Sequence, residues 1–302
     1  MRKQLLLLFV GISTALHLQA QTEADAIMMM KNNFCSGIVY QKSTWNEYWE
    51  GTYKRDNANL GTVSTQMLGV MGNYGISNRL NVLFNLPYVQ TKASAGQLRG
   101  MKGLQDFSLW VKWLPLQKEV GKGTLSTFLI GGYALPASNY TPDFLPMSIG
   151  LGSKTASLRG MVDYQWGNWF GTASATYMRR NNITIDRPAY YTTEMHYSNE
   201  VAMPDASQFG LRAGYRSARL IAEALLYNFN TLGGFDISKN NMPFPSNKMN
   251  STTAGLNLKY EFKKLKGLSL ISGGNYTIAG LNVGQSTAWY GGVFYAVNFN
   301  KN

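Results

Sequence analysis

Apolar and polar residues alternate along much of this chain, and one stretch shows the pattern clearly. The stretch at residues 74–89 reads YGISNRLNVLFNLPYV, and every second residue in its middle is apolar: Leu80, Val82, Phe84 and Leu86. Asn81 and Asn85 lie between these apolar positions. A period of two is typical of a β-strand with one apolar and one polar face. Pro87 is compatible with such a strand near its end, where a missing ladder hydrogen bond costs less.

About twelve stretches share this period of two. They lie at 34–45, 61–74, 80–90, 104–115, 123–135, 155–166, 169–180, 207–217, 219–229, 252–263, 268–279 and 286–299. A tilted transmembrane strand needs about 9–11 residues to cross the bilayer core. The pattern therefore predicts about twelve strands that are each long enough to cross a membrane.

The links between these stretches alternate between short and long. The short ones lie at 75–79, 116–122, 167–168, 217–218 and 263–267. The longer polar ones lie at 46–60, 91–103, 136–154, 181–206 and 230–251, with a shorter one at 280–285. Outer-membrane barrels have short periplasmic turns and longer external loops. We therefore expect an all-β fold, a transmembrane antiparallel up-and-down β-barrel of about 12 strands with both termini on the periplasmic side.

The two faces of each strand predict which side chains contact lipid. Leu211 and Leu256 belong to apolar faces, whereas their neighbours Arg212 and Asn257 belong to polar ones. Lysine or arginine facing lipid at mid-membrane costs about 2–4 kcal/mol, so the polar faces are expected to line the interior.

Two short links also predict strand register. If the GN link is a two-residue turn, Trp166 lies opposite Trp169 and both face outward at the periplasmic interface, which indole rings prefer. If the SA link is also a two-residue turn, Arg212 lies opposite Glu223 on the inner face.

The N-terminus and the composition indicate export. Residues 1–20 combine a basic start, an apolar run over residues 5–12 and a small residue at Ala20, which is typical of a secretory signal peptide. The remaining residues, 21–302, would form the barrel. Only 15% of the residues are charged, compared with about 25% in soluble domains. No stretch approaches the roughly 20 apolar residues of a transmembrane helix. We therefore expect the protein in the outer membrane of a Gram-negative bacterium, in contact with outer-membrane lipid.

Motifs for catalysis or cofactor binding are weak. His196 is followed by Ser198 and preceded by Glu194, which permits a hydrolase but is weak evidence for one within a loop. Cys35 is the only cysteine, and no pair of metal ligands has a metal-site spacing. The 28 lysines and arginines are scattered rather than clustered, which argues against nucleic acid as a partner. The sequence therefore predicts no enzyme, no cofactor and no metal.

Charged residues on the predicted inner faces form a candidate constriction. They are Lys112, Arg159, Asp163, Arg212, Arg216, Glu223, Lys259 and Glu261. The interior of such a barrel is narrow, so we expect these charges to pair with one another, Arg212 with Glu223 first. Five basic residues against three acidic ones would favour anionic or electron-rich polar solutes. A belt that only stiffens the barrel is an equal alternative.

Aromatic residues in the two longest links are candidates for solute contact. They are Tyr190, Tyr191, Tyr197, Phe235 and Phe244. Ligand sites favour concave surfaces lined by aromatic side chains with few polar groups. The competing interpretation is that these residues pack on one another to close the top of the barrel.

A set of residues within 74–113 resembles a known family. They are Tyr74-Gly75, Leu80, Val82, Leu86-Pro87-Tyr88, Gly103-Leu104-Gln105-Asp106, Leu109 and Lys112-Trp113. The chain is similar to outer-membrane barrel proteins named for the MetA pathway of phenol degradation, which are distantly similar to the long-chain fatty-acid channels. The resemblance implies transport of small, often aromatic, hydrophobic compounds. The fatty-acid channels have an N-terminal plug of several tens of residues, whereas only residues 21–33 precede the first predicted strand here.

Together these patterns predict an outer-membrane, porin-like channel or transporter for small, hydrophobic or aromatic solutes. A structural or surface-binding barrel with a closed lumen is the main alternative, and a membrane-embedded hydrolase is the third. The pattern leaves the particular solute, the gating and the oligomeric state open.

Overall fold

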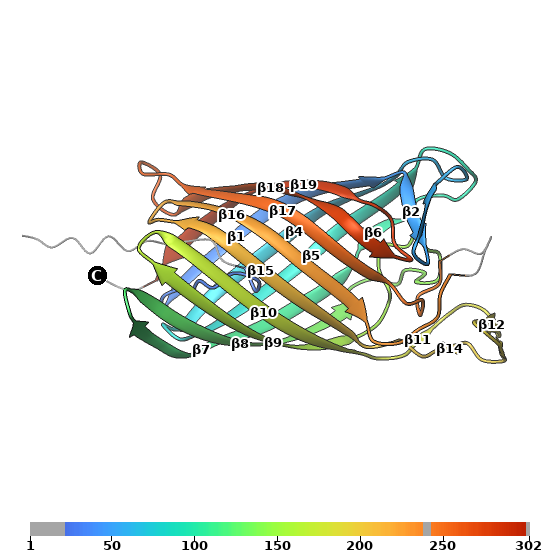
Figure 1. Cartoon of the computed structure of the whole chain (residues 1–302), viewed down its shortest axis with the longest axis horizontal. Coiled ribbons are helices and arrows are strands. Elements are labelled where there is room, and N and C mark those ends of the chain that lie inside the picture. Colours follow the sequence, from blue (N-terminus) through green and yellow to red (C-terminus); the bar gives the residue numbers. More distant parts are fainter. Residues whose placement is uncertain (1–21, 238–242, 300–302) are drawn as a thin grey trace, which may run out of the picture.

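The described chain is a closed β-barrel (Figure 1). The computed structural model describes residues 22–237 and 243–299. Twelve long strands form the ring in this part of the chain: β1 (Asn33–Trp45), β4 (Val63–Ser77), β5 (Leu80–Ala93), β7 (Asp106–Val120), β8 (Gly123–Pro136), β9 (Thr155–Trp166), β10 (Trp169–Arg180), β15 (Ala206–Arg216), β16 (Leu220–Thr231), β17 (Asn250–Glu261), β18 (Leu268–Leu281) and β19 (Thr287–Asn298). β1 pairs antiparallel with β4 and with β19, which closes the ring and confirms the predicted fold class.

The two ends of the barrel differ as the link lengths predict. Short turns and the end of β19 lie at the left of Figure 1, and the long loops lie at the right. The long loops carry the seven short strands: β2 (Glu47–Glu50), β3 (Tyr53–Asp56), β6 (Lys102–Leu104), β11 (Ile183–Thr184), β12 (Tyr190–Tyr191), β13 (Met195–His196) and β14 (Glu200–Val201). The sequence pattern does not predict these strands, because each has only two to four residues.

The outer wall is apolar, as the alternation predicts. The exposed fraction is 56% for Leu211 and 68% for Leu256, while Lys112 on an inner face has an exposed fraction of 0%. Trp166 and Trp169 are exposed partners across the turn that joins β9 to β10, which confirms that register. A closed ring leaves no unpaired strand edge, and this is the condition for crossing lipid with strands. In the described residues no helix is long and apolar enough to span a membrane.

The predicted register of β15 with β16 is wrong by two residues. Arg216 pairs with Ile221, so Glu223 lies opposite Gly214 rather than opposite Arg212. The link is longer than the predicted two-residue turn and is closed by a hydrogen bond from Ser217 N to Leu220 O of 2.8 Å. A shift of two keeps every side chain on its face, so Glu223 remains inside.

Pro87 lies at a gap in the ladder. The pairing of β5 with β7 ends at Asn85, and the pairing with β6 begins at Tyr88. Gln105 N bridges the gap by donating to Pro87 O at 2.9 Å. The missing N–H of proline therefore falls where no ladder bond is needed. The predicted signal peptide, residues 1–20, lies outside the described residues.

Candidate channel lumen

The segment at residues 22–32 lies inside the barrel and is held there by Lys112. The Nζ of Lys112 donates to Thr22 O at 3.1 Å, Asp25 O at 2.6 Å and Ile27 O at 2.8 Å. It also pairs with the Asp25 carboxylate at 3.0 Å. A fully buried ammonium is very costly without such partners. Lys112 on β7 therefore anchors this N-terminal segment in the lumen.

Two arginines from other strands bind the same segment. Arg159 on β9 donates from Nη1 to Glu23 O at 3.0 Å. Arg212 on β15 donates from Nη1 to Ala24 O at 2.6 Å. Guanidinium groups offer several donors in a fixed plane, so each arginine can bind the segment and the wall together. Three cations thus bind main-chain carbonyl oxygens of one short stretch.

The rest of the segment is fixed to β4 and β5 before it enters β1. Asn81 accepts from Met29 N at 3.2 Å and donates to Met29 O at 3.0 Å. The backbone passes so close to Gly75 that a Cβ there would lie 2.1 Å from Met30 O. Asn81 was expected in the lumen, and the structure shows what it binds there. The sequence pattern does not predict the role of residues 22–32, although their acidic residues and methionines set them apart.

The predicted ion-pair belt surrounds this segment. Arg212 forms a bidentate pair with Glu223, whose carboxylate also accepts from Asn257 at 2.7 Å. Arg216 pairs with Asp163 at 3.0 Å. The structure therefore brings Arg212 and Glu223 together despite the register error, because they remain diagonal neighbours on one face.

The remaining predicted lumen residues lie on inner faces too. Arg159 donates from Nε to Thr176 at 2.8 Å, and Lys259 and Glu261 lie on the polar face of β17. The eight predicted residues include five basic and three acidic ones, and the segment adds Glu23 and Asp25. The predicted excess of two positive charges therefore falls to one when the segment, which also carries the exposed Lys31, is in place.

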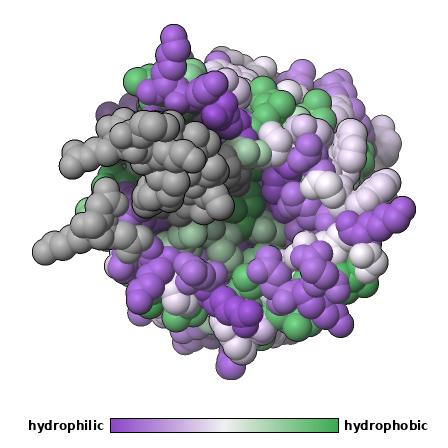
Figure 2. Space-filling view, turned by 90° about the vertical axis from the view of Figure 1, so that its left-hand side faces the viewer, coloured by the Kyte–Doolittle hydropathy of each residue, from purple (hydrophilic) through white to green (hydrophobic). Residues whose placement is uncertain are grey.

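A cavity of about 520 Å³ adjoins the segment at the short-turn end. It is lined by the segment itself, including Met28 and Met30, and by wall residues such as Gln117 and Arg216. Figure 2 looks at this end and shows hydrophilic residues around the rim, with hydrophobic ones in the hollow. The lumen thus opens toward this end and is obstructed deeper inside by the N-terminal segment.

Aromatic residues of the long loops form a small core at the opposite end. The ring of Tyr190 stacks on that of Phe244 with centroids 5.3 Å apart, and Phe235 lies 6.3 Å from Phe244. These three and Tyr191 line a cavity of about 570 Å³. Tyr197, with an exposed fraction of 87%, does not line it. Tyr190, Phe235 and Phe244 therefore pack on one another, and Tyr191, with an exposed fraction of 55%, joins them only in lining the cavity. Contact with a solute stays a prediction.

The loop histidine has partners unlike those of a hydrolase. His196 stacks on Tyr190 at 4.7 Å, and its Nε2 lies 2.8 Å from the Thr192 hydroxyl. Ser198 instead accepts a hydrogen bond from Glu200 N at 3.0 Å. In the ranges that the structure describes, no group of three metal-binding side chains occurs. Ser198, the nucleophile that the sequence offers, is therefore not bonded to His196; the hydroxyl within hydrogen-bond distance of the imidazole is that of Thr192.

One further polar contact fixes the loop that follows β8. Tyr140 donates to Asp106 at 2.5 Å and accepts from Gly152 N at 3.1 Å. Burial raises the pKa of Tyr140, and its hydrogen bond to the Asp106 carboxylate raises it further. Tyr140 is therefore a protonated donor at neutral pH and ties the loop to the mouth of the barrel.

The closed antiparallel ring with its apolar outer wall defines an outer-membrane β-barrel. The COG4313 outer membrane channel from Pseudomonas putida F1 has the same fold, with a TM-score of 0.69 and 13% identity over 92% of this chain and 100% of that one. The translocator domain of the autotransporter NalP from Neisseria meningitidis gives a TM-score of 0.45 with 10% identity, over 90% of each chain. No family model and no curated protein matches the chain, so the resemblance to the phenol-degradation family stays a prediction.

Proposed function

We propose that this protein is an outer-membrane channel for small solutes and that residues 22–32 control its conductance. The observation that carries this proposal is the set of bonds from Lys112, Arg159 and Arg212 to main-chain oxygens of the segment. The segment forms neither strand nor helix, and its backbone bonds to the strands involve its last residues, such as Asn32 N to Gly75 O at 2.8 Å, so departure of residues 22–29 from the lumen would break no ladder of the barrel. Residues 22–32 obstruct the lumen while the strands around them stay fixed, so departure of this segment would open the channel.

The channel-type fold shared with the Pseudomonas putida F1 protein supports the same proposal. The finer prediction of hydrophobic or aromatic solutes rests on the sequence resemblance and on the aromatic cavity at Tyr190 and Phe244. The eight belt residues would then select among solutes that pass the segment. The alternative is a structural or surface-binding barrel whose lumen stays closed.

Planar-bilayer conductance separates these two functions. The purified protein is compared with a variant that lacks residues 22–30 and with one in which Gly-Ser repeats replace the same residues at equal length. We expect conductance to rise severalfold in both variants, because each removes the anchoring Asp25 and the methionines. Gel mobility before and after boiling shows that the barrel has formed. A folded deletion variant without conductance would overturn the channel proposal.

Entry of solutes is tested by swelling of liposomes that contain the deletion variant. Benzyl alcohol and a neutral sugar of similar size provide the two solute classes. Faster entry of the aromatic alcohol, corrected for its passage through protein-free liposomes, is the expected result. Equal rates would contradict the hydrophobic or aromatic preference while leaving the channel itself in place.

A further inference from the structure

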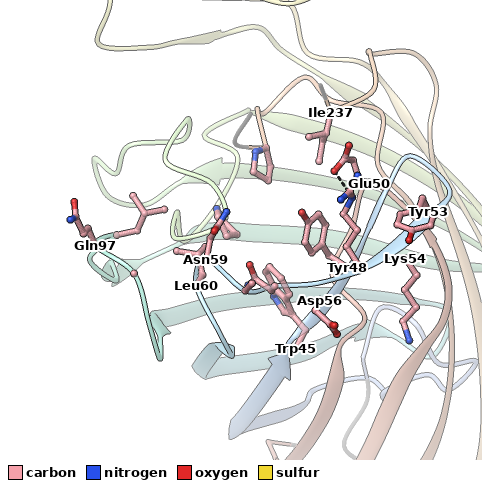
Figure 3. A pocket seen from close by; sticks show the side chains of 17 residues that line it. Trp45, Tyr48, Glu50, Tyr53, Lys54, Asp56, Asn59, Leu60, Gln97 and Ile237 are labelled. Atoms are coloured by element: carbon pink, nitrogen blue, oxygen red, sulfur yellow. Dashed lines mark ion pairs between the residues drawn. The ribbon is translucent and has the colours of Figure 1, made fainter. Parts of the chain in front are cut away.

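Another cavity lies at the long-loop end, away from the belt and beside the aromatic loop cavity, with which it shares Ile237 and Pro243 in its lining. Its volume is about 670 Å³, and it is bounded by the end of β1, the β2–β3 hairpin and the turn at 96–98 (Figure 3). Trp45 lies on the same face of β1 as the buried Cys35 and Val39, so this wall continues the inner face of the barrel. The cavity is within the range of about 300–1,000 Å³ that is typical of ligand sites.

The aromatic wall of the cavity is held in place by the neighbouring strand end. Trp49 N donates to Val283 O at 2.8 Å, and Gln285 N donates to Glu47 O at 2.8 Å. The indole of Trp49 is buried against Gly280, where an added Cβ would lie 2.5 Å from the ring. The hairpin that carries Tyr48 is therefore a fixed platform rather than a free loop tip.

The opposite wall is fixed by backbone bonds between two further segments. Ala95 N donates to Leu60 O at 3.0 Å, and Ser94 N donates to Thr62 O at 3.0 Å. These bonds hold the chain around Asn59 against the turn at 94–97, while the Asn59 side chain stays exposed. Both walls are thus formed before any ligand arrives, which reduces the entropy cost of binding.

The side chains in the cavity combine aromatic faces with neutral polar groups. Trp45 and Tyr48 lie with ring centroids 6.3 Å apart at 64°, and Asn59 faces the same cavity in Figure 3. Asparagine offers both a carbonyl acceptor and two N–H donors, and the tyrosine hydroxyl can do either.

The charged groups of the cavity largely satisfy one another. Arg55 pairs with Glu50 at 2.8 Å, and Lys54 pairs with Glu47 at 2.6 Å. Glu50 and Asp56 balance Lys54 and Arg55 among the lining residues. The site therefore offers no net charge to attract an ion, and an ionic ligand would have to compete with existing pairs.

We infer that this cavity is a binding site for neutral saccharides. A pyranose ring presents an apolar C–H face that stacks on indole and phenol rings, and hydroxyls around its edge that bond to amides and carboxylates. Trp45 and Tyr48 provide the stacking surface, and Asn59, Glu50 and Asp56 provide edge contacts. The inference goes beyond the proposed channel, because binding at this surface needs no passage through the lumen.

Saturation-transfer NMR on the full-length protein in detergent tests the inference without any measurement of transport. Maltose represents a free saccharide, a neutral oligosaccharide released from lipopolysaccharide represents the sugar coat of the cell, and benzyl alcohol and glucuronate are the competing classes. We expect saturation of the sugar ring protons for at least one of the two neutral saccharides. The one that binds more tightly shows whether the ligand is a free saccharide or the sugar coat of the cell. Binding of benzyl alcohol or glucuronate alone would overturn the inference.

Variants connect the binding to this cavity. Tyr48→Ala is expected to weaken saccharide binding by about tenfold, equivalent to about 1.4 kcal/mol for one lost stacking partner. Asn59→Ala changes an exposed side chain and is expected to weaken binding severalfold even if Tyr48→Ala disturbs the hairpin. Tyr197→Ala removes an exposed tyrosine from another loop and serves as the matched control. Unchanged affinity in both cavity variants would refute the site.

Discussion

The two ends of the barrel interior are built in different ways. Near the short turns, Lys112, Arg159 and Arg212 bind residues of a segment that lie between 85 and 188 positions away in sequence. Near the long loops, short hairpins such as the one that pairs Tyr190 with His196 are joined to other loops by contacts such as the stack of Tyr190 on Phe244.

This difference separates what depends on barrel closure from what does not. The cations on three strands approach the segment together only after the sheet has curved into a ring. The loop core at Tyr190 and Phe244 needs only short ladders and a small apolar cluster, whereas the β2–β3 hairpin also bonds to the segment after β18 through Trp49 N and Val283 O. Changes near the short turns should therefore affect conduction, and changes near the long loops should stay local.

Lys112→Met is expected to have the largest effect. The substitution removes four contacts between Lys112 and the segment and leaves Asp25 buried without its cation. If the segment stayed in the lumen, the unpaired carboxylate would cost about 3–5 kcal/mol. Departure of the segment relieves this cost, so single-channel conductance should rise severalfold. Lys118→Met alters an exposed lysine of the same strand and should conduct like the wild type. Wild-type conductance in a folded Lys112→Met barrel would refute the anchoring role of this lysine.

The double variant Arg212→Ala, Arg216→Ala tests the belt itself. It removes two positive charges while Asp163 and Glu223 remain, so the lumen becomes acidic on balance. We expect the reversal potential in a salt gradient to move toward cation selectivity, and the shift should shrink at high ionic strength. Unchanged selectivity and conductance in the folded variant would reduce the belt to a structural role.

Phe244→Ala tests whether the loop core is independent of the barrel. Loss of a buried phenylalanine costs about 3–5 kcal/mol, here confined to the cluster with Tyr190 and Phe235. We expect faster chymotryptic cleavage after Tyr190, whose ring stacks on that of Phe244 with centroids 5.3 Å apart. The heat-dependent gel mobility of the barrel should not change. A lower unfolding temperature of the whole barrel would show that the two regions are coupled.

Trp169→Leu should have the smallest effect. The indole contacts Tyr215 edge to face at 5.7 Å on the outer wall, and such a pair contributes about 0.5–1.5 kcal/mol. The free energy of unfolding in lipid vesicles should fall by about that amount, with conductance unchanged. A much larger loss would mean that this residue does more than stabilise one turn.

The sequence predicts the wall of the barrel much better than its contents. Alternation at positions such as Leu211 and Arg212 reports on which side of a sheet a residue lies, and this depends only on local geometry. Glu223 lies on the predicted face because the register shift beside it is two residues, an even number. Strand count and strand faces therefore follow from local pattern, whereas the exact length of a turn does not.

The lumen contents could not be predicted in the same way. Residues 22–32 have no periodicity, and they bind the cations of the wall mainly through their own main-chain oxygens, which leave no mark on side-chain identity. Lys112 is predicted to face inward, but nothing in its neighbourhood identifies Asp25 as its partner. The short hairpins of the loops escape prediction because two to four residues are too few to show a period.

The meeting of β1 with β19 has a consequence for the order of assembly. The first and last strands of the ring pair with each other, so this seam joins residues that are about 260 positions apart, as Cys35 and Ala296 are. The segment before β1 is covalently joined to this seam strand. The segment can therefore bind Lys112, Arg159 and Arg212 together only once this seam has sealed the ring, which makes its binding a late step of assembly.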